Sequence, residues 1–135
     1  MKVFAVFDTN VLVSALISKR SDTAVVLALE TLLNGEVTPL YNDEIVAEYK
    51  EVLHRDKFKL PGQLVDGIIN QVKNQGISSV RVHSDESFPD QEDVVFYEVA
   101  LSREDSFLVT GNTNHFPKNQ IVVTPLEFLK KIGKL

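Results

Sequence analysis

The sequence predicts an α/β protein of three α/β/α layers, with a mostly parallel, five-stranded central sheet between layers of helices. The first observation is the continuous apolar run over residues 3–7, which is typical of a strand covered on both faces. The second is that runs of strand length alternate with longer segments of helical periodicity. The third is the length of 135 residues, which fits a single domain over residues 1–135.

Two helices are expected after the first strand. Residues 11–17 form a short apolar helix that ends at the polar break SKRSD. The second helix covers residues 23–34, with Ser21 or Asp22 as its candidate cap and Gly35 as its stop. Its apolar run VVLALETLL is expected to belong to the core rather than to an interface.

A short strand and a third helix follow. The strand is PLY, residues 39–41, and Pro39 is expected at its first position because proline cannot donate to a strand ladder. The helix over residues 42–55 is amphipathic, and Asn42 or Asp43 can cap its first turn. Together these segments predict a strand that leads directly into a helix.

The middle of the chain supplies one more helix and the third strand. Pro61-Gly62 separates the preceding helix from a helix over residues 64–74, which ends at Gly76. The run SSVRV, residues 78–82, is expected to be the third strand. The polar loop HSDESFPD follows it.

The last third of the chain completes the alternation. A helix is expected over residues 90–103, and the runs FLVT at 107–110 and IVV at 121–123 are the fourth and fifth strands. Pro125 then opens a terminal helix at its first position, where a missing N–H costs nothing. The order of elements therefore favours parallel strand pairing throughout.

The composition excludes several classes of protein. Without cysteine there is no disulfide framework, thiolate zinc site or catalytic thiol. The N-terminus has no small-residue cleavage site, and no apolar run reaches the roughly 18 residues of a membrane span. We expect a cytoplasmic protein that is neither exported nor inserted into a membrane.

The net charge of -5 argues against a protein that coats nucleic acid non-specifically, because that affinity comes largely from Lys and Arg on phosphates. It does not exclude a nuclease, since a metal-dependent site concentrates acids and bound cations reverse the local field. Basic side chains remain at Lys19, Arg20, Arg55, Lys57, Lys59, Lys130, Lys131 and Lys134.

Asp8 stands where the first strand leaves the core. Burying an ionised carboxylate without a partner is very costly, so Asp8 must be solvated, paired or bound to a metal. In open parallel sheets, sites form outside the carboxyl ends of the strands. Gly111-Asn112 follows the fourth strand, so it is expected at the same edge as Asp8.

Glu48 is the acid of its helix best placed to reach Asp8. At about 100° per residue the helix has one apolar arc, and Glu48 lies on its shoulder, roughly 40° from Val52. Glu44 and Glu51 point further out. The alternative is that Glu48 is a solvated surface glutamate.

Asp93 lies on the face of its helix that is expected to pack against the sheet, together with Phe96 and Ala100. The alternative is structural, with Asp90 as the N-cap and Asp93 as an acid of the first turn favoured by the helix dipole. Asp90 and Glu92 also compete with Asp93 for any chemical role.

The segment LVTGN ends a strand in a glycine, where a ligand can approach the backbone closely, although an ordinary turn explains it equally well. Asn112 can bind a phosphate or a metal-bound water but brings no charge. His115 is expected to be a loop or capping histidine, because no second histidine lies at metal-site spacing. The pattern leaves open whether Ser14 faces the site or the core.

Four segments together resemble the PIN-domain family, metal-dependent ribonucleases that are common as toxins of prokaryotic toxin-antitoxin pairs. The segments are VFDTNVLVSAL, NDEIVAEYKEVL, DQEDVVFYEVAL and FLVTGNTNHFP, and in this order they cover nearly the whole chain. The resemblance places the family's catalytic, metal-binding acids on Asp8, Glu48 and Asp93. Many members have Asp where this chain has Asn112, a departure that bears on a second metal ion, while three acids can still hold one.

The resemblance implies a PIN-like fold and an endoribonuclease that uses Mg²⁺ or Mn²⁺, hard cations that prefer oxygen ligands. Thr9 and Asn10 match the small polar residues beside the first acid, and Asn10 is expected to orient its carboxylate. The resemblance also implies an RNA substrate, a cognate antitoxin that inserts a segment near the acids, and often a homodimer. The substrate-binding residues cannot be identified from the sequence.

Three other functions compete with this one. A haloacid-dehalogenase-type phosphatase needs an Asp-x-Asp motif, but Asn10 stands at its second acid and no downstream lysine motif is convincing. A receiver domain needs paired acids after its first strand and a phosphoacceptor after its third, and neither Asp8 nor Val82-His83 supplies these. The non-enzyme alternative is a degenerate PIN module that binds RNA or a protein partner without cutting, which Asn112 favours.

Overall fold

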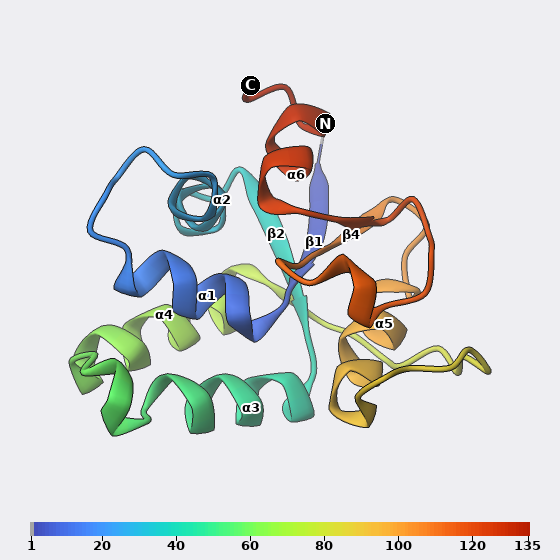
Figure 1. Cartoon of the computed structure of the whole chain (residues 1–135), viewed down its shortest axis with the longest axis horizontal. Helices are drawn as coiled ribbons and strands as arrows, with labels where there is room; N and C mark the ends of the chain where they lie inside the picture. Colours follow the sequence, from blue (N-terminus) through green and yellow to red (C-terminus); the bar gives the residue numbers. More distant parts are fainter. Residues whose placement is uncertain (1) are drawn as a thin grey trace.

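Five parallel strands form one sheet in the order β3-β2-β1-β4-β5, with six helices around it, in a computed structural model that describes residues 2–135 (Figure 1). The predicted fold class is therefore confirmed. The strands are β1 (Val3–Phe7), β2 (Val37–Tyr41), β3 (Ile77–Ser78), β4 (Ser106–Val109) and β5 (Val122–Val123). The helices are α1 (Thr9–Ile17), α2 (Ala24–Leu33), α3 (Asp43–Leu53), α4 (Gly62–Gln75), α5 (Val94–Ala100) and α6 (Pro125–Lys131).

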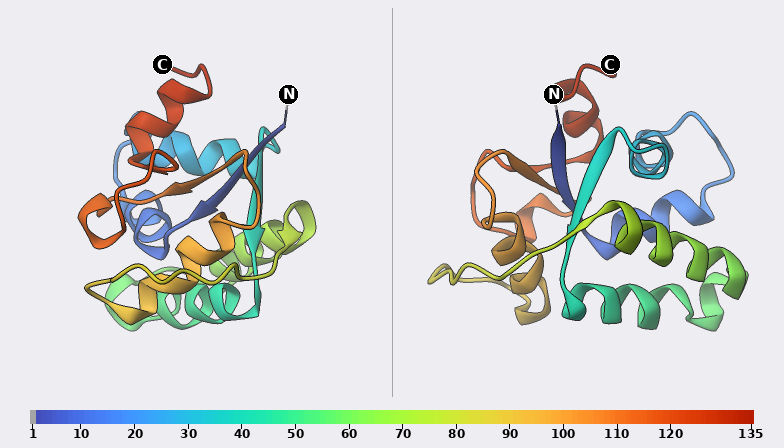
Figure 2. Two further views of the ribbon diagram at one scale, coloured as in Figure 1. Left: turned by 90° about the vertical axis from the view of Figure 1, so that its right-hand side faces the viewer. Right: turned by 180° about the vertical axis from the view of Figure 1, so that it is seen from behind.

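The helices form a layer on each face of the sheet. On one face α2, α4 and α6 contact the strands, and α1 packs on α2, while α5 covers β1, β2 and β4 on the other face (Figures 1 and 2). Helix α3 contacts α1, α4 and α5, so it crosses the end of the sheet where β1 and β2 finish. This arrangement encloses the carboxyl ends of the central strands between α1, α3 and α5.

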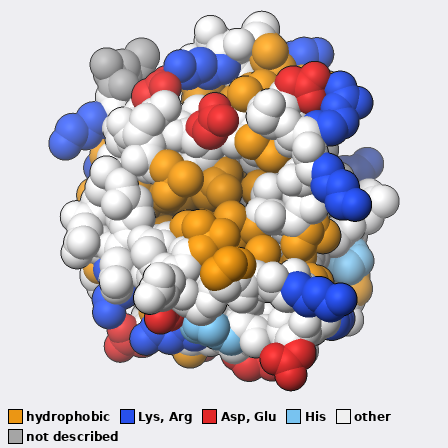
Figure 3. Space-filling view, turned by 90° about the vertical axis from the view of Figure 1, so that its left-hand side faces the viewer, with side chains coloured by type: hydrophobic (Ala, Val, Ile, Leu, Met, Phe, Trp, Pro, Cys, Tyr) orange, Lys and Arg blue, Asp and Glu red, His pale blue; other side chains and the backbone are white. Residues whose placement is uncertain are grey.

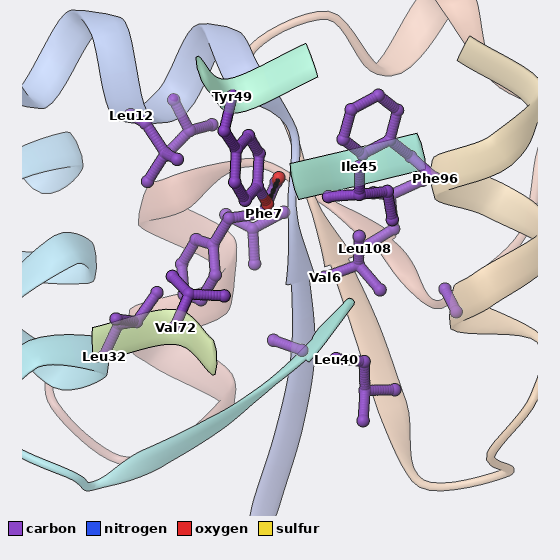
Figure 4. Packing of buried hydrophobic residues seen from close by; sticks show 14 of the residues in the cluster. Val6, Phe7, Leu12, Leu32, Leu40, Ile45, Tyr49, Val72, Phe96 and Leu108 are labelled. Carbon is purple, nitrogen blue, oxygen red and sulfur yellow. Dashed lines mark hydrogen bonds between the residues drawn. The ribbon is translucent and has the colours of Figure 1, made fainter. Parts of the chain in front are cut away.

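The core explains why β1 is apolar at every position. Val6 and Phe7 point to opposite faces of the sheet, and both are almost fully buried (Figure 4). Phe7 meets the edge of Phe128 from α6, with ring centroids 6.0 Å apart, while Val6 lies on the side of Phe96 from α5. A strand covered on both faces cannot carry a polar residue until it ends, which it does at Asp8.

The N-terminal ends of several helices differ from prediction, and α4 begins at Gly62, two residues earlier than expected. Helix α1 begins at Thr9, two residues earlier than expected, so Asp8 occupies its N-cap position. The N-cap position of α2 is Thr23, because Asp22 instead forms an exposed ion pair with Arg20 at 2.8 Å. The predicted cap of α3 is confirmed, since the Asn42 side chain accepts a hydrogen bond from the Ile45 backbone N–H.

The prediction that Pro39 begins its strand was wrong. Strand β2 begins two residues earlier, and Pro39 lies at its centre, paired in register with Ala5 of β1. The Pro39 carbonyl oxygen lies next to Gly76, on the side of β3. The amide and carbonyl of one strand residue point to the same side, so the missing N–H of Pro39 also faces β3. Within residues 2–135, β3 pairs with Leu40 and Tyr41 and not with Pro39, so the proline removes no hydrogen bond between these strands.

The third strand is shorter than the predicted run over residues 78–82. Strand β3 stops at Ser78 because its neighbour β2 ends at Tyr41, where the chain turns into α3. The following segment is extended but carries no strand, as both views of Figure 2 show in yellow. Val80 in this segment is 73% exposed. The Arg81 guanidinium forms ion pairs with the carboxylates of Glu44 and Glu98, at nitrogen–oxygen distances of 2.9 and 2.8 Å. The run SSVRV was expected to be a strand throughout, but within residues 2–135 no neighbouring strand extends far enough to pair with it.

The predicted helix over residues 90–103 is interrupted at its start. A 3₁₀ turn covers Gln91–Asp93, and the α-helix α5 begins only at Val94 and ends at Ala100. Asp90 caps the turn by accepting a hydrogen bond from the Glu92 backbone N–H at 2.9 Å. The turn moves Asp93 to the N-cap position of α5.

Gly76 offers a direct test of the contact between α4 and β2. A Cβ atom on Gly76 would lie 2.4 Å from the Val72 carbonyl oxygen and 2.5 Å from the Pro39 carbonyl oxygen, and neither backbone can yield easily. Gly76→Ala is expected to lower the free energy of unfolding by about 2 kcal/mol, as overpacked sites do. Urea unfolding followed by circular dichroism measures this change.

Gly67→Ala is the matched control, because Gly67 is exposed in α4 and, among residues 2–135, no heavy atom beyond its own helix backbone lies within 4 Å of its built Cβ. Alanine is a better helix former than glycine, so this variant should gain about 0.5–1 kcal/mol. Equal effects of the two substitutions would contradict the close approach at Gly76.

One face of the molecule carries a hydrophobic patch. Figure 3 shows the side where α1 ends and α4 begins, and hydrophobic side chains gather at its centre within a polar and charged border. Ile17 of α1 and Leu64 of α4 are 49% and 44% exposed. Patches of this kind on other proteins commonly mark contact surfaces. Across the part of the chain that the structure describes, no helix combines the length and apolar character needed to span a membrane.

Candidate active site

Asp8 is fixed at the carboxyl end of the sheet by its neighbours on β4. The register pairs Phe7 with Val109, so Asp8 and Thr110 stand opposite each other one residue beyond the paired strands. The Asp8 backbone N–H donates to the Val109 carbonyl at 2.9 Å, and the Thr110 hydroxyl donates to Oδ2 of Asp8 at 2.7 Å. The Asp8 carboxylate is therefore buried and is oriented by the Thr110 hydroxyl.

Glu48 reaches the same place from α3. Its Oε2 accepts a hydrogen bond from the hydroxyl of Thr9, the residue next to Asp8. The following residue, Tyr49, donates its buried hydroxyl to the Phe7 carbonyl at the end of β1. These two bonds tie α3 to the end of β1, and they hold Glu48 beside Asp8 although 40 positions separate the two acids in the sequence.

Asp93 approaches from the start of α5, and its carboxylate is only 17% exposed. Although Asp93 occupies the N-cap position, its side chain makes no capping hydrogen bond to any described residue. Its Oδ2 is buried and has no hydrogen-bond partner within residues 2–135. Asp90 caps the preceding turn and Asp93 lies in that turn, as the structural alternative predicts, but this arrangement gives Oδ2 of Asp93 no partner. An unpartnered buried carboxylate oxygen is unfavourable and requires an explanation.

A cavity of about 180 Å³ brings the three acids together. It adjoins a more open groove of about 460 Å³ along α3, and the two share Glu48, Val52, Arg55 and Glu92. Arg55 is the cationic side chain in the cavity wall, and it pairs with Glu51 at 2.7 Å. The residues that line the smaller cavity are Asp8, Thr9, Asn10, Glu48, Val52, Arg55, Asp90, Glu92 and Asp93.

Burial disfavours the charged form of Asp8, Glu48 and Asp93, and for Glu48 and Asp93 the charges of neighbouring acids add to this effect. Burial is the main cause that raises the pKa of Asp8 above its ordinary value, with the Thr110 hydroxyl acting in the opposite direction. Burial also raises the pKa of Glu48, and the charges of Asp8, Glu92 and Asp90 raise it further. For Asp93, burial and the charges of Asp8 and Asp90 raise the pKa to about 6. Such clustering of perturbed carboxyl groups is typical of functional sites.

The loop after β4 contributes a different residue from the one expected. Asn112 is exposed, is absent from the cavity lining, and donates its backbone N–H to the Thr110 hydroxyl at 3.0 Å. His115, three residues further along, turns towards the acids, and its Nδ1 lies 3.5 Å from Oδ2 of Asp93. The sequence predicted a loop or capping role for His115, because no second histidine lies at metal-site spacing. The 3₁₀ turn Thr113–His115 that orients it has no clear sequence signal.

The structure also shows where the other predicted polar residues lie relative to the cavity. Asn10 is exposed and lines the cavity, and Thr9 is buried beside it. Ser14 is exposed on α1 and lies outside the cavity lining, so it faces neither the core nor the acids. Thr110, which orients Asp8, was missed although the quoted segment LVTGN contains it. Its role depends on strand register, which the sequence does not specify.

The donor set fits a hydrated divalent cation. The cavity offers carboxylate oxygens, the ligands that Mg²⁺ and Mn²⁺ prefer, and the unpartnered Oδ2 of Asp93 would gain a partner. Among residues 2–135, however, no three His, Asp or Glu side chains are already close enough together to bind one ion directly. An ion would therefore keep several water ligands here, as Mg²⁺ usually does in proteins. The assignment of Asp8, Glu48 and Asp93 as its ligands stays a prediction.

Comparison with known families agrees with this geometry. A family model described as PIN domain matches residues 5–114, a span that includes Asp8, Glu48, Asp93 and the loop through Asn112. No curated protein and no solved structure is similar enough to this chain to count as a match. PIN domains are generally nucleases that use divalent metal ions. Because the matched span covers most of the sequence, the chain belongs to the PIN-domain family.

Proposed function

We propose that this protein is a metal-dependent endoribonuclease that hydrolyses RNA phosphodiester bonds, acting as one PIN-like domain over residues 1–135. The observation that supports it is the convergence of Asp8, Glu48 and Asp93 on one cavity at the carboxyl end of the sheet. A bound Mg²⁺ or Mn²⁺ would lower the pKa of an attacking water and neutralise charge that builds on the phosphate oxygens. Asp8, Asp93 and Glu48 are the residues that would hold it.

The protein's own residues have distinct tasks in this proposal. Thr110 occupies one oxygen of Asp8 and so directs the other towards a ligand. Asp93 brings an unpartnered oxygen that is ready for an ion. Glu48, fixed by Thr9 and with its pKa raised by burial, can accept a proton from the attacking water more readily than an ordinary glutamate.

The groove along α3 is the proposed path of the RNA backbone. It opens beside the acid cavity, and Arg55 belongs to both. A guanidinium suits a phosphate because it offers several donors in a fixed plane. Its pairing with Glu51 is exposed and therefore weak, so a phosphate can compete for Arg55.

The proposed cellular role rests on the resemblance to the PIN-domain family. We propose that the protein is the toxin of a toxin-antitoxin pair in the cytoplasm, inhibited by an antitoxin segment that brings a basic side chain to the acid cavity. A homodimer is proposed as well, and the hydrophobic patch of Figure 3 is a surface that could support it. The positive charge proposed for the inhibitor is supported by the acidic lining of the cavity, because opposite charges attract.

A second candidate function is a PIN module that binds RNA or a protein partner without cutting. It is favoured by Asn112, which carries no charge and lies away from the cavity lining. It is also favoured by the lack of three preassembled ligands in residues 2–135. The two functions differ in one measurable property, which is metal-dependent cleavage.

Cleavage of mixed RNA by the purified protein in Mn²⁺ tests the proposal. The wild type is expected to cut, a chelator is expected to stop it, and Glu48→Gln is expected to lower the rate about a hundredfold, a typical effect of losing a proton-transfer group. Asp43→Asn is the control, because Asp43 is exposed on the same helix and lies outside the cavity lining. RNA binding without cleavage would support the second function, and cleavage by Glu48→Gln at the wild-type rate would overturn the role proposed for Glu48.

A further inference from the structure

His115 and Asp93 form an unusual pair beside the acid cavity. Nδ1 of His115 lies 3.5 Å from Oδ2 of Asp93, which is too far for a good hydrogen bond. Oδ2 is buried, and no other described residue donates to it. The two atoms are close enough for an ion pair when the imidazole is protonated, but they form no hydrogen bond with each other.

An ion between them would explain this separation. A divalent ion with octahedral ligands at about 2.1 Å holds neighbouring donor atoms about 3 Å apart, close to the separation of these two atoms. The imidazole would then need to be neutral, with its lone pair on Nδ1. His115 is half exposed, so its Nε2 can keep a proton that water solvates.

We propose that His115 and Asp93 together bind a divalent ion, and that the imidazole makes this site prefer Mn²⁺ to Mg²⁺. The inference rests on the proposed function, since it concerns the ion that this function requires. Imidazole nitrogen is a good ligand for transition metals, whereas Mg²⁺ strongly prefers oxygen. In this proposal the loop after β4 provides a nitrogen ligand through His115, which lies beside Asp93 although neither it nor the exposed Asn112 is part of the cavity lining.

Titration calorimetry of the full chain with Mn²⁺ and, separately, with Mg²⁺ tests the preference. The wild type is expected to bind Mn²⁺ at least about tenfold more tightly than Mg²⁺. His115→Ala should lose about tenfold in Mn²⁺ affinity with little change for Mg²⁺, and His115→Asp should bind Mg²⁺ more tightly than the wild type. His54→Ala is the matched control, because His54 pairs with Asp66 on an exposed surface outside the cavity lining.

Pulsed electron paramagnetic resonance of bound Mn²⁺ gives a readout that does not depend on activity. A directly coordinated imidazole produces modulation from its ¹⁴N nucleus, which should be present in the wild type and in His54→Ala and absent from His115→Ala. Circular dichroism confirms that each variant is folded.

The outcomes separate this inference from the proposed function. Mn²⁺ binding that Asp8→Asn abolishes, but without ¹⁴N modulation and with no effect of His115→Ala, would overturn the role of His115 and leave the proposed nuclease standing. A wild type that binds neither ion would overturn both. Cleavage of RNA with equal affinities for Mn²⁺ and Mg²⁺ would overturn the metal preference alone.

Discussion

Asp8→Asn is expected to lower metal-dependent RNA cleavage about a thousandfold and to raise the melting temperature of the metal-free protein by a few degrees. Loss of the proposed central ligand would remove several kcal/mol of transition-state stabilisation, and each 1.4 kcal/mol corresponds to about tenfold in rate. The stability of the metal-free protein should rise, although the activity falls. Asp8 is only 5% exposed and the pKa of its carboxyl group is raised, mainly by burial, so its charge at neutral pH costs folding energy that a neutral amide does not.

The geometry at Asp8 favours this substitution. Asparagine has nearly the shape of aspartate, and its amide oxygen can still accept the hydrogen bond from the Thr110 hydroxyl. Most substitutions at buried positions destabilise a protein, so a gain in stability with a loss of activity is a specific signature of a charged functional site.

Thermal melts with chelator and with Mn²⁺ measure both parts of the stability effect. The wild type should melt higher in Mn²⁺, because an ion that binds only the folded state stabilises it, and Asp8→Asn should not respond. Asp43→Asn removes one charge from an exposed position and should keep the wild-type response. A full Mn²⁺ response in Asp8→Asn would show that the ion binds elsewhere.

The fold could be predicted because its main signals are local. Apolar strands such as residues 3–7 are continuous, the helices between them are periodic, and caps such as Asn42 follow from hydrogen bonding within one turn. The strand predicted at residues 78–82 failed because a strand needs a neighbour, and β2 had already ended at Tyr41. Strand length depends on the partner, which local sequence does not contain.

The same distinction applies to the candidate site. The position of Asp8 at the carboxyl end of the sheet follows from where its strand ends. The orientation of Glu48 towards Asp8 follows from helical spacing. Thr110 and His115 could not be chosen in this way. Thr110 depends on the register between β1 and β4, and His115 depends on a single 3₁₀ turn that rotates it towards Asp93.

The metal-free protein is expected to lose stability as the pH rises from 5 to 7.5, and Asp93 is expected to cause a large part of this loss. Burial, with the charges of Asp8 and Asp90, raises the pKa of Asp93 to about 6, from an ordinary value of 3.8 that the unfolded chain retains. Between these two values the folded protein binds more protons than the unfolded chain, so the free energy of unfolding falls as the pH rises and is lowest above pH 6.

Asp93→Asn isolates this effect. Because the amide does not titrate, the loss of stability between pH 5 and pH 7.5 should be smaller than in the wild type by about 1 kcal/mol, or roughly 3 °C in melting temperature. Melts in chelator at the two pH values measure it, and Asp43→Asn, with the same change of charge at an exposed position, should keep the wild-type slope. Asp8 and Glu48 stay in the variant, and since burial raises the pKa of each, part of the slope will remain. A slope in Asp93→Asn equal to that of the wild type would mean that Asp93 is not held in a buried, negatively charged environment, and the unpartnered oxygen on which the proposed metal site depends would lose its significance.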